Sequence, residues 1–278
     1  MTSKWSLRRF VIGIGLDKIW WITATYRLSA SLRQFMRGSR YADRIPPPSA
    51  PMSTRPPLKN ELESFFDEHA EGPGIFKWRH YFEIYDKHLS RFREQSPVVV
   101  EIGVAGGGSM QMWRHYFGPG SHIYGIDIDP SCRRFEGDGV EIFIGDQGAP
   151  SFWRQFIARC PAIDVVIDDG SHEALHQAAT LESLLPHIRP GGVYICEDIQ
   201  GPFQPFNSFI DALTRPLSEI RPSDVNGDVH ALHRQIASVH RYPLLAVIEK
   251  QNYTPVFEST YRGSEWPSDW SVPESAHR

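Results

Sequence analysis

The stretch VVVEIGVAGGGSMQMW, residues 98–113, decides the fold. A short run of apolar, mostly β-branched residues is followed by a glycine-rich loop and then by SMQMW, whose apolar spacing suits a helix. Four similar runs follow along the chain: IYGIDID, VEIFIGD, DVVIDD and GVYICED. Short apolar runs of this kind are typical of strands that are buried on both faces of a sheet.

Helix-compatible segments, such as PSFWRQFIARC and ALHQAATLESLLPHI, lie between these runs. Alternating strands and helices imply right-handed crossovers and an α/β fold with a doubly wound, mostly parallel sheet of the Rossmann type. Two helices separated by a turn are predicted ahead of the first strand. Two more strands are predicted near the end, in VHRYPLLAVIEKQNY.

The composition limits the class of protein. A chain of 278 residues with 41% apolar content can bury one core of catalytic-domain size. A net charge of -4 gives no general attraction to phosphate backbones, so nucleic acid is disfavoured as a partner. The three cysteines, Cys132, Cys160 and Cys196, form neither a disulfide framework nor a zinc pair. A cytoplasmic location is the default expectation.

Residues 1–45 form an apolar stretch with basic flanks, interrupted by Asp17 and Lys18. The pieces are too short to span a bilayer, which needs about 20 apolar residues. Three interpretations stay open: an amphipathic helix that packs on the protein or a partner, contact with a membrane surface, and a signal or disordered start. A proline-rich linker is predicted over 46–57, the main domain over 58–262, and a C-terminal tail over 263–278.

Polar side chains follow every predicted strand of the main run. The carboxyl ends of parallel strands meet at one rim of a sheet, where α/β proteins bind their ligands. Any one acid there could simply cap a helix or make a turn. The whole set indicates a binding site: Glu101 to Gly108, Asp127 and Asp129, Asp146, Asp168 to His172, and Glu197 with Asp198.

The glycine loop does not match the dinucleotide-binding pattern, because Ala105 stands where the second glycine is required. Asp127 lies about one βαβ half-unit after the loop, where a carboxylate can bind both hydroxyls of a ribose. The loop and this acid together predict a nucleoside-containing ligand. A nicotinamide-linked reductase is disfavoured by Ala105 and by the lack of a separate hydride-transfer constellation.

These residues resemble the class I S-adenosylmethionine-dependent methyltransferases over roughly residues 77–198. The resemblance implies an antiparallel edge at the C-terminal end of the sheet. It also implies the residues that bind each part of the cofactor. The methionine part would contact Glu101, Gly103 and the glycine loop with Gly106 and Ser109, and Asp168 would help to hold its amino-acid end. Asp127 would bind the ribose, and Asp146 with Gln147 would bind the adenine.

A more specific resemblance is to the metal-dependent sugar O-methyltransferases of macrolide biosynthesis and their cephalosporin-hydroxylase-like relatives. It is carried by motifs in a fixed order: KWRHYFEIYDKHL, GDQ, DDGSH, EDI and IASVHRYPLLAVIEK. Relatives often have TDK where this chain has IFK, at residues 75–77. The resemblance implies a divalent metal and an acceptor hydroxyl.

The residue types agree with that chemistry. Asp169, Glu197 and Asp198 offer hard oxygen ligands, which suit Mg²⁺ or Mn²⁺. His172, three residues after Asp169, is predicted to be the general base. The alternatives are that DDGSH caps a helix with His172 on the surface, and that Glu197 and Asp198 are turn residues.

His80 and His88 are interpreted as packing or surface histidines, because their local sequence has no ligand spacing. His176, one helical turn after His172, could face either the site or solvent.

The expected function is therefore O-methylation of a sugar hydroxyl in a glycoside, glycolipid or natural product, dependent on S-adenosylmethionine and assisted by a divalent metal. Two other hypotheses stay open: a catechol-type or other small-molecule O-methyltransferase, and a non-catalytic scaffold with the same fold. The acceptor is the expected partner. Membrane-surface contact through residues 1–45 and homo-oligomerisation are left open.

Overall fold

The computed structural model describes residues 59–160, 162–200, 205–218 and 235–252. The predictions for residues 1–45, 46–57 and 263–278 lie outside these ranges. Within the described ranges, no helix is both long and apolar enough to cross a membrane.

In the described part of the chain, the sheet has seven strands in the order β3-β2-β1-β4-β5-β7-β6. The first five strands pair in parallel, and β7 is antiparallel to both of its neighbours, so the predicted fold class and antiparallel edge are confirmed. The strands are β1 (Val98–Ile102), β2 (His122–Asp127), β3 (Val140–Ile144), β4 (Ile163–Asp168), β5 (Ile188–Cys196), β6 (Ile236–Tyr242) and β7 (Leu245–Lys250).

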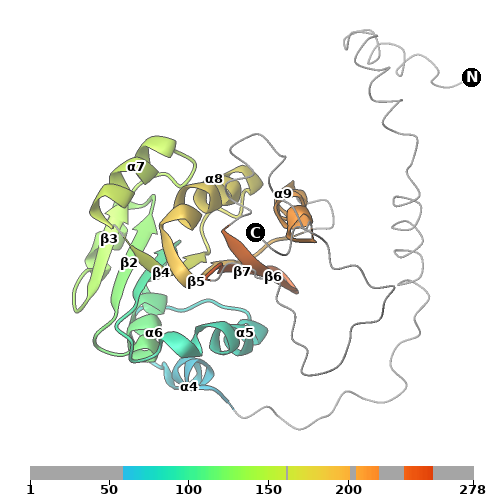
Figure 1. Cartoon of the computed structure of the whole chain (residues 1–278). Helices are drawn as coiled ribbons and strands as arrows, with labels where there is room; N and C mark the ends of the chain where they lie inside the picture. Colours follow the sequence, from blue (N-terminus) through green and yellow to red (C-terminus); the bar gives the residue numbers. More distant parts are fainter. Residues whose placement is uncertain (1–58, 161, 201–204, 219–234, 253–278) are drawn as a thin grey trace, which may run out of the picture. The chain divides into compact units, whose positions relative to one another are not determined.

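Helices cover both faces of the sheet (Figure 1). One layer contains α4 (Glu61–Glu68), α5 (Arg79–Leu89) and α6 (Gly108–Phe117). The other contains α7 (Pro150–Arg159), α8 (Ala174–Leu184) and α9 (Pro205–Thr214). Short 3-10 turns complete the elements: η1 (Ser90–Phe92), η2 (Pro130–Phe135), η3 (Leu185–His187) and η4 (Arg215–Ser218).

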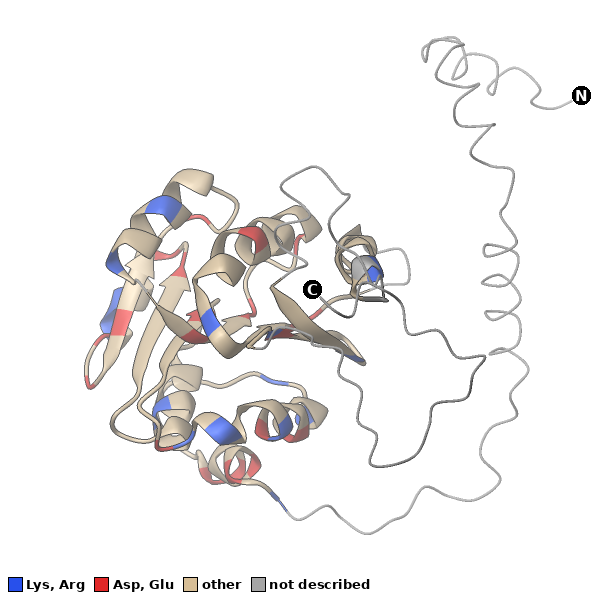
Figure 2. Ribbon diagram, viewed as in Figure 1, with Lys and Arg blue, Asp and Glu red and all other residues tan. Residues whose placement is uncertain are grey.

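Alternation along the strands sends side chains into two cores. On β1, Val99 packs with the α4–α6 layer, whereas Val100 packs with the α7–α9 layer. Large aromatic side chains fill both cores: Tyr85 and Trp113 on one face, Trp153 on the other. Each such side chain contributes about 1.5–3 kcal/mol through burial. Charged residues of both signs lie on the flanking helices, and the strands are mostly uncharged (Figure 2).

The register brings the carboxyl ends of the central strands level with one another. Ile102 at the end of β1 pairs with both Ile126 and Asp168, and Asp168 pairs in turn with Cys196. The residues that follow β1, β2, β4 and β5 therefore emerge at the same rim. This alignment positions the candidate site.

The long segment after β5 contains α9, which packs on the sheet with Phe206, Ile210 and Leu213 fully buried. Arg241 on β6 also binds α9, because its Nη2 donates a hydrogen bond to Asp211 Oδ1 at 2.6 Å. Residues 201–204 and 219–230 of that segment lie outside the described ranges.

We predict that Gly103→Ala destabilises the fold. Gly103 has φ +92°, and a Cβ there would lie 2.0 Å from the carbonyl oxygen of Asp169, so strand ends β1 and β4 would have to separate. The expected loss is at least about 1–3 kcal/mol in the free energy of unfolding, measured by urea denaturation.

Gly74→Ala is the matched control, because a Cβ at Gly74 meets no atom within 4 Å. Its stability should stay within about 1 kcal/mol of the wild type. Equal losses in the two variants would contradict this account of Gly103.

Candidate active site

A cavity of about 760 Å³ lies at the carboxyl ends of the strands. Its wall is made by the glycine loop after β1, the ends of β2 and β3, the loop after β4, and the segment 74–77 that precedes α5. Predicted site residues that line it are Gly103, Gly106, Ser109, Asp127, Asp146, Gln147, Asp169, His172 and Asp198. The fold thus brings most of the predicted residues to one cavity.

The glycine loop is shaped by close backbone contacts within the protein. A Cβ at Gly106 would lie 2.7 Å from the carbonyl oxygen of Gly74, and a Cβ at Gly108 would lie 2.3 Å from that of Pro73. The glycines therefore let the segment before α5 pack directly on the loop.

Asp127 fixes the other side of the loop. Its Oδ2 accepts hydrogen bonds from the backbone N–H groups of Val104 and Ala105 at 3.0 and 2.9 Å. Its Oδ1 accepts one from the N–H of Asp129 at 2.8 Å. These bonds hold the carboxylate at the cavity wall, where a ligand hydroxyl can use its remaining acceptor capacity.

Asp168 and Gln147 form a buried pair beneath the cavity. Gln147 Nε2 donates to Asp168 Oδ1 at 2.6 Å, and the Tyr194 hydroxyl donates to Oδ2 at 2.6 Å. Burial raises the pKa of Asp168 to about 7. The side-chain oxygen of Gln147, Oε1, accepts a hydrogen bond from the backbone N–H of Ser171, and this bond fixes the loop after β4. Asp168 itself does not line the cavity.

Lys77 is the centre of a buried cluster that joins three strand ends. Its side chain is 3% exposed, and Nζ lies 2.6 Å from Asp169 Oδ2, 3.0 Å from Glu197 Oε2 and 3.4 Å from Glu101 Oε1. Ser109 Oγ also donates to Glu101 at 2.8 Å. Glu101 and Glu197 contact the lysine and do not line the cavity.

The cluster is short of positive charge. One ammonium faces three carboxylates. Burial alone would lower the pKa of Lys77, but the carboxylates raise it well above its ordinary value. Burial raises the pKa of Glu101 and of Glu197, and Lys77 acts against that rise.

Asp169, His172 and Asp198 each offer one ligand atom, and these atoms lie within 4.8 Å of one another. The side chains are partly exposed, at 20%, 39% and 22%, so they are open to the cavity. His172 and Asp198 have φ values of 58° and 52°, in the left-handed region that costs non-glycine residues energy. Such strain is concentrated at functional sites in proteins.

Aromatic side chains from the start of α5 orient the acids after β5. Trp78 Nε1 donates to Asp198 Oδ1 at 3.0 Å, and the Tyr81 hydroxyl lies 2.9 Å from the same oxygen. The Tyr85 hydroxyl donates to Glu197 Oε1 at 2.6 Å. Asp198 Oδ2 is left facing His172 Nε2 at 3.9 Å.

No role was predicted from the sequence for Lys77, Trp78, Tyr81 or Tyr85. The available signal was the spacing of the two tyrosines, which stand four residues apart and so share one face of a helix. Nothing in the local sequence says that this face meets the acids after β5, some 110 residues later.

Residues 100–199 match a family described as a methyltransferase domain. This chain carries a methyltransferase domain. Its relatives confirm the predicted resemblance. The chain is 36% identical over 200 residues to 8-demethyl-8-alpha-L-rhamnosyl tetracenomycin-C 2'-O-methyltransferase of Streptomyces olivaceus. The aligned residues make up 64% of this chain and 52% of that protein.

A second relative of the methyltransferase domain is mycinamicin VI 2''-O-methyltransferase of Micromonospora griseorubida, 34% identical over 201 residues, 63% of this chain and 49% of that protein. The chain thus spans about half the length of these relatives. Among solved structures, the MycE methyltransferase of the mycinamycin pathway, in complex with Mg and SAH, matches with a TM-score of 0.56 and 30% identity. The match covers 69% of this chain and 54% of MycE.

We predict that Lys77→Met strongly destabilises the methyltransferase domain, because it leaves buried carboxylates without their cation. The expected loss is about 3–5 kcal/mol in the free energy of unfolding, measured by urea denaturation. Lys87→Met is the control, since Lys87 is exposed on α5 with its ammonium over the Tyr242 ring, and its change should stay within about 1 kcal/mol. A Lys77→Met protein as stable as this control would show that the ion pairs do not support the fold.

Proposed function

We propose that this protein is a divalent-metal-assisted, S-adenosylmethionine-dependent O-methyltransferase that acts on a sugar hydroxyl of a glycoside. The observation that carries the proposal is one juxtaposition: the oxygen and nitrogen donors of Asp169, His172 and Asp198 open into the same cavity as the glycine loop and Asp127. The proposed cofactor-binding residues, the proposed metal ligands Asp169 and Asp198 and the proposed base His172 therefore line one cavity.

The cavity fits the cofactor in size and chemistry. About 760 Å³ lies within the range of small-molecule sites, and a Cβ at Gly74 would project into open space there. Asp127 is proposed to bind the ribose, Asp146 and Gln147 the adenine end, and Gly103, Gly106 and Ser109 the methionine part. Glu101 and Asp168 would act indirectly: Glu101 accepts a hydrogen bond from Ser109, and Asp168 accepts one from Gln147. When bound, S-adenosylmethionine supplies the methyl group.

The donor set also fits a hard divalent cation. Asp169 and Asp198 line the cavity, and carboxylate oxygens are the ligands that such a cation prefers. Glu197 stays a predicted ligand, although its buried carboxylate is bound by Lys77 and does not line the cavity. When bound, Mg²⁺ or Mn²⁺ lowers the pKa of an acceptor hydroxyl and fixes its position.

His172 is proposed to accept the proton of the acceptor hydroxyl. Its side chain is open to the cavity, and Asp198 Oδ2, 3.9 Å from Nε2, would stabilise the imidazolium that forms. Trp78 and Tyr81 hold Asp198 in that position through its other oxygen. Lys77 holds Asp169 in position by a hydrogen bond to its Oδ2.

The class of acceptor is proposed from the relatives. The named reactions of the Streptomyces and Micromonospora proteins are O-methylations of antibiotic glycosides. One structure of MycE contains mycinamycin VI together with Mg and SAH. A sugar hydroxyl is a very weak acid, so a cation and a base in one cavity suit this acceptor.

The test is calorimetric titration of the purified full chain with S-adenosylmethionine and with Mg²⁺. The wild type should bind both, and Asp169→Ala should bind Mg²⁺ at least about tenfold more weakly while keeping the cofactor, because it removes a metal ligand. Asp138→Ala, at an exposed acid outside the cavity, is the control and should match the wild type. A folded wild type that binds neither ligand would favour the scaffold hypothesis.

A second prediction concerns His172→Ala. Loss of a general base should lower turnover by roughly 10² to 10⁴ on a panel of glycosides that includes the acceptors of the relatives. Affinities for S-adenosylmethionine and Mg²⁺ should be unchanged. His80→Ala should leave turnover unchanged, since His80 is exposed, hydrogen-bonds the carbonyl oxygen of Pro243 and does not line the cavity.

The calorimetry separates two roles of His172. If His172→Ala instead loses Mg²⁺ affinity, His172 is a metal ligand and the assignment as base is wrong. Near-normal turnover would remove His172 from the mechanism altogether.

A further inference from the structure

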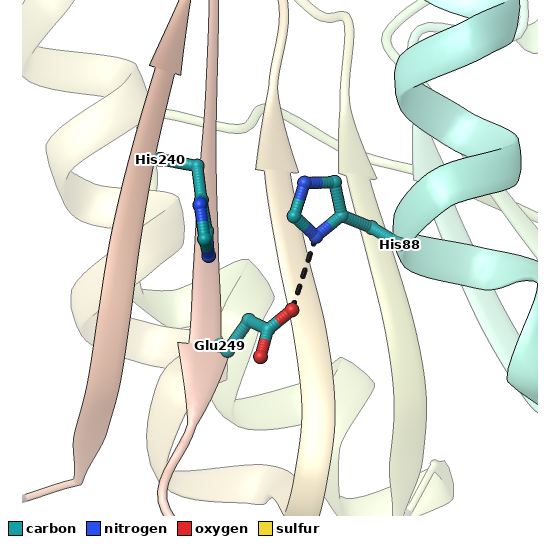
Figure 3. Close-up of side chains that lie close together, drawn as sticks. All are labelled: His88, His240 and Glu249. Atoms are coloured by element: carbon teal, nitrogen blue, oxygen red, sulfur yellow. Dashed lines mark hydrogen bonds and ion pairs between the residues drawn. The ribbon is translucent and has the colours of Figure 1, made fainter.

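A second group of metal-ligating side chains lies away from the cavity, where α5 packs on the β6–β7 hairpin. It consists of His88 on α5, His240 on β6 and Glu249 on β7 (Figure 3). One ligand atom from each residue lies within 4.8 Å of the others. Nothing in the proposed methyl transfer uses these residues.

The hairpin register brings two of the three together. Ser238 pairs with Glu249 and His240 pairs with Val247, so His240 and Glu249 are diagonal neighbours on one face of the hairpin. His88 reaches that face from the last turn of α5. Its Nδ1 lies 3.0 Å from Glu249 Oε1, and its ring centroid lies 4.7 Å from that of His240. Figure 3 shows the three side chains converging from three elements.

We propose that His88, His240 and Glu249 form a structural binding site for a transition metal ion of the zinc class. Two imidazole nitrogens and one carboxylate oxygen are a donor set that suits Zn²⁺ and similar ions. The set differs in kind from the oxygen-rich group at the cavity, which suits Mg²⁺. The 3.0 Å between His88 Nδ1 and Glu249 Oε1 is short enough for one ion to bind both atoms.

The surroundings of His88 also match those of a metal-bound histidine. Its side chain is 4% exposed, and its Nε2 lies 2.9 Å from the Tyr242 hydroxyl. Metal-bound histidines commonly donate their second ring N–H to such an oxygen, which fixes the ring orientation. Burial lowers the pKa of His88, and this favours the neutral imidazole that metals bind. Glu249, at 26% exposure, leaves a path from solvent.

The competing explanation is a hydrogen-bonded packing cluster. Without a metal, His88 has a partner for each ring nitrogen, and Arg91 Nη1 lies 3.5 Å from Glu249 Oε1. Binding of an ion would replace the contact between Arg91 and Glu249. A packing cluster predicts no metal-dependent change in stability, so the two explanations can be separated.

The experiment uses the full chain, treated with a chelator and then dialysed. Co²⁺ is titrated in the presence of excess Mg²⁺, which occupies the cavity group, and binding is followed by the visible absorption of Co²⁺. The melting temperature is recorded with and without Zn²⁺. The wild type should bind Co²⁺ and melt at a higher temperature with Zn²⁺, because a ligand that binds only the folded state stabilises it.

Three variants locate the ion. Glu249→Gln and His240→Gln should each weaken Co²⁺ binding at least about tenfold, and Tyr242→Phe should weaken it roughly 10- to 100-fold by removing the partner of His88. All three positions lie on the hairpin, and circular dichroism without metal checks that each variant is folded. Asp169→Ala should bind Co²⁺ as the wild type does.

The proposal is overturned if folded wild-type protein shows neither Co²⁺ binding nor a Zn²⁺-dependent rise in melting temperature. It is also overturned if the three hairpin variants bind Co²⁺ as tightly as the wild type, or if Asp169→Ala abolishes the binding. These outcomes are independent of the proposed methyl transfer, because they require neither cofactor nor acceptor.

Discussion

The ion-pair cluster around Lys77 is the constraint on which the rest of the site depends. Lys77 precedes α5, yet its ammonium contacts acids on or after β1, β4 and β5. Removing one lysine and three carboxylates from water is expensive, and only good mutual geometry repays the cost. The segment before α5 is therefore held at the centre of the rim. Every other contact of the site is built around that position.

One consequence is the shape of the glycine loop. With Lys77 anchored, the residues just before it lie directly on Gly106 and Gly108, where no side chain could fit. Another is the orientation of the acids after β5. Trp78, Tyr81 and Tyr85 follow Lys77 into α5 and hold Asp198 and Glu197 by hydrogen bonds. A single buried cation thus positions both the wall of the cavity and the acids that face it.

The fold was predictable from the sequence because strands buried on both faces have an unmistakable apolar pattern. The positions of the strand ends followed, and with them the group of acids at one rim. The direction in which each side chain points was not predictable from the sequence. Asp168 is buried under the cavity whereas Asp169, the next residue, faces it, and Glu197 is bound by Lys77 and Tyr85. These differences depend on partners far away in the chain, which local patterns do not contain.

The helix α5 also explains why the hairpin matters to the cavity. Along one side of α5, His80 contacts the carbonyl oxygen of Pro243 at 2.9 Å, and the Tyr81 hydroxyl lies 3.2 Å from that of Leu244. The Leu244 carbonyl also accepts from the N–H of Ile199, next to Asp198. The turn of the hairpin, the start of α5 and the loop after β5 therefore share one hydrogen-bonded junction.

His88 lies at the other end of the same helix, against the same hairpin. An ion bound there would fix the helix and the hairpin as one unit, because its ligands come from α5, β6 and β7. Among the strands that the structure describes, β6 lies at the edge of the sheet and pairs with β7 alone. Edge elements have fewer contacts than central ones and open more readily. A restraint at His88 would therefore hold the outermost strands against α5, the helix whose Tyr81 contacts Asp198.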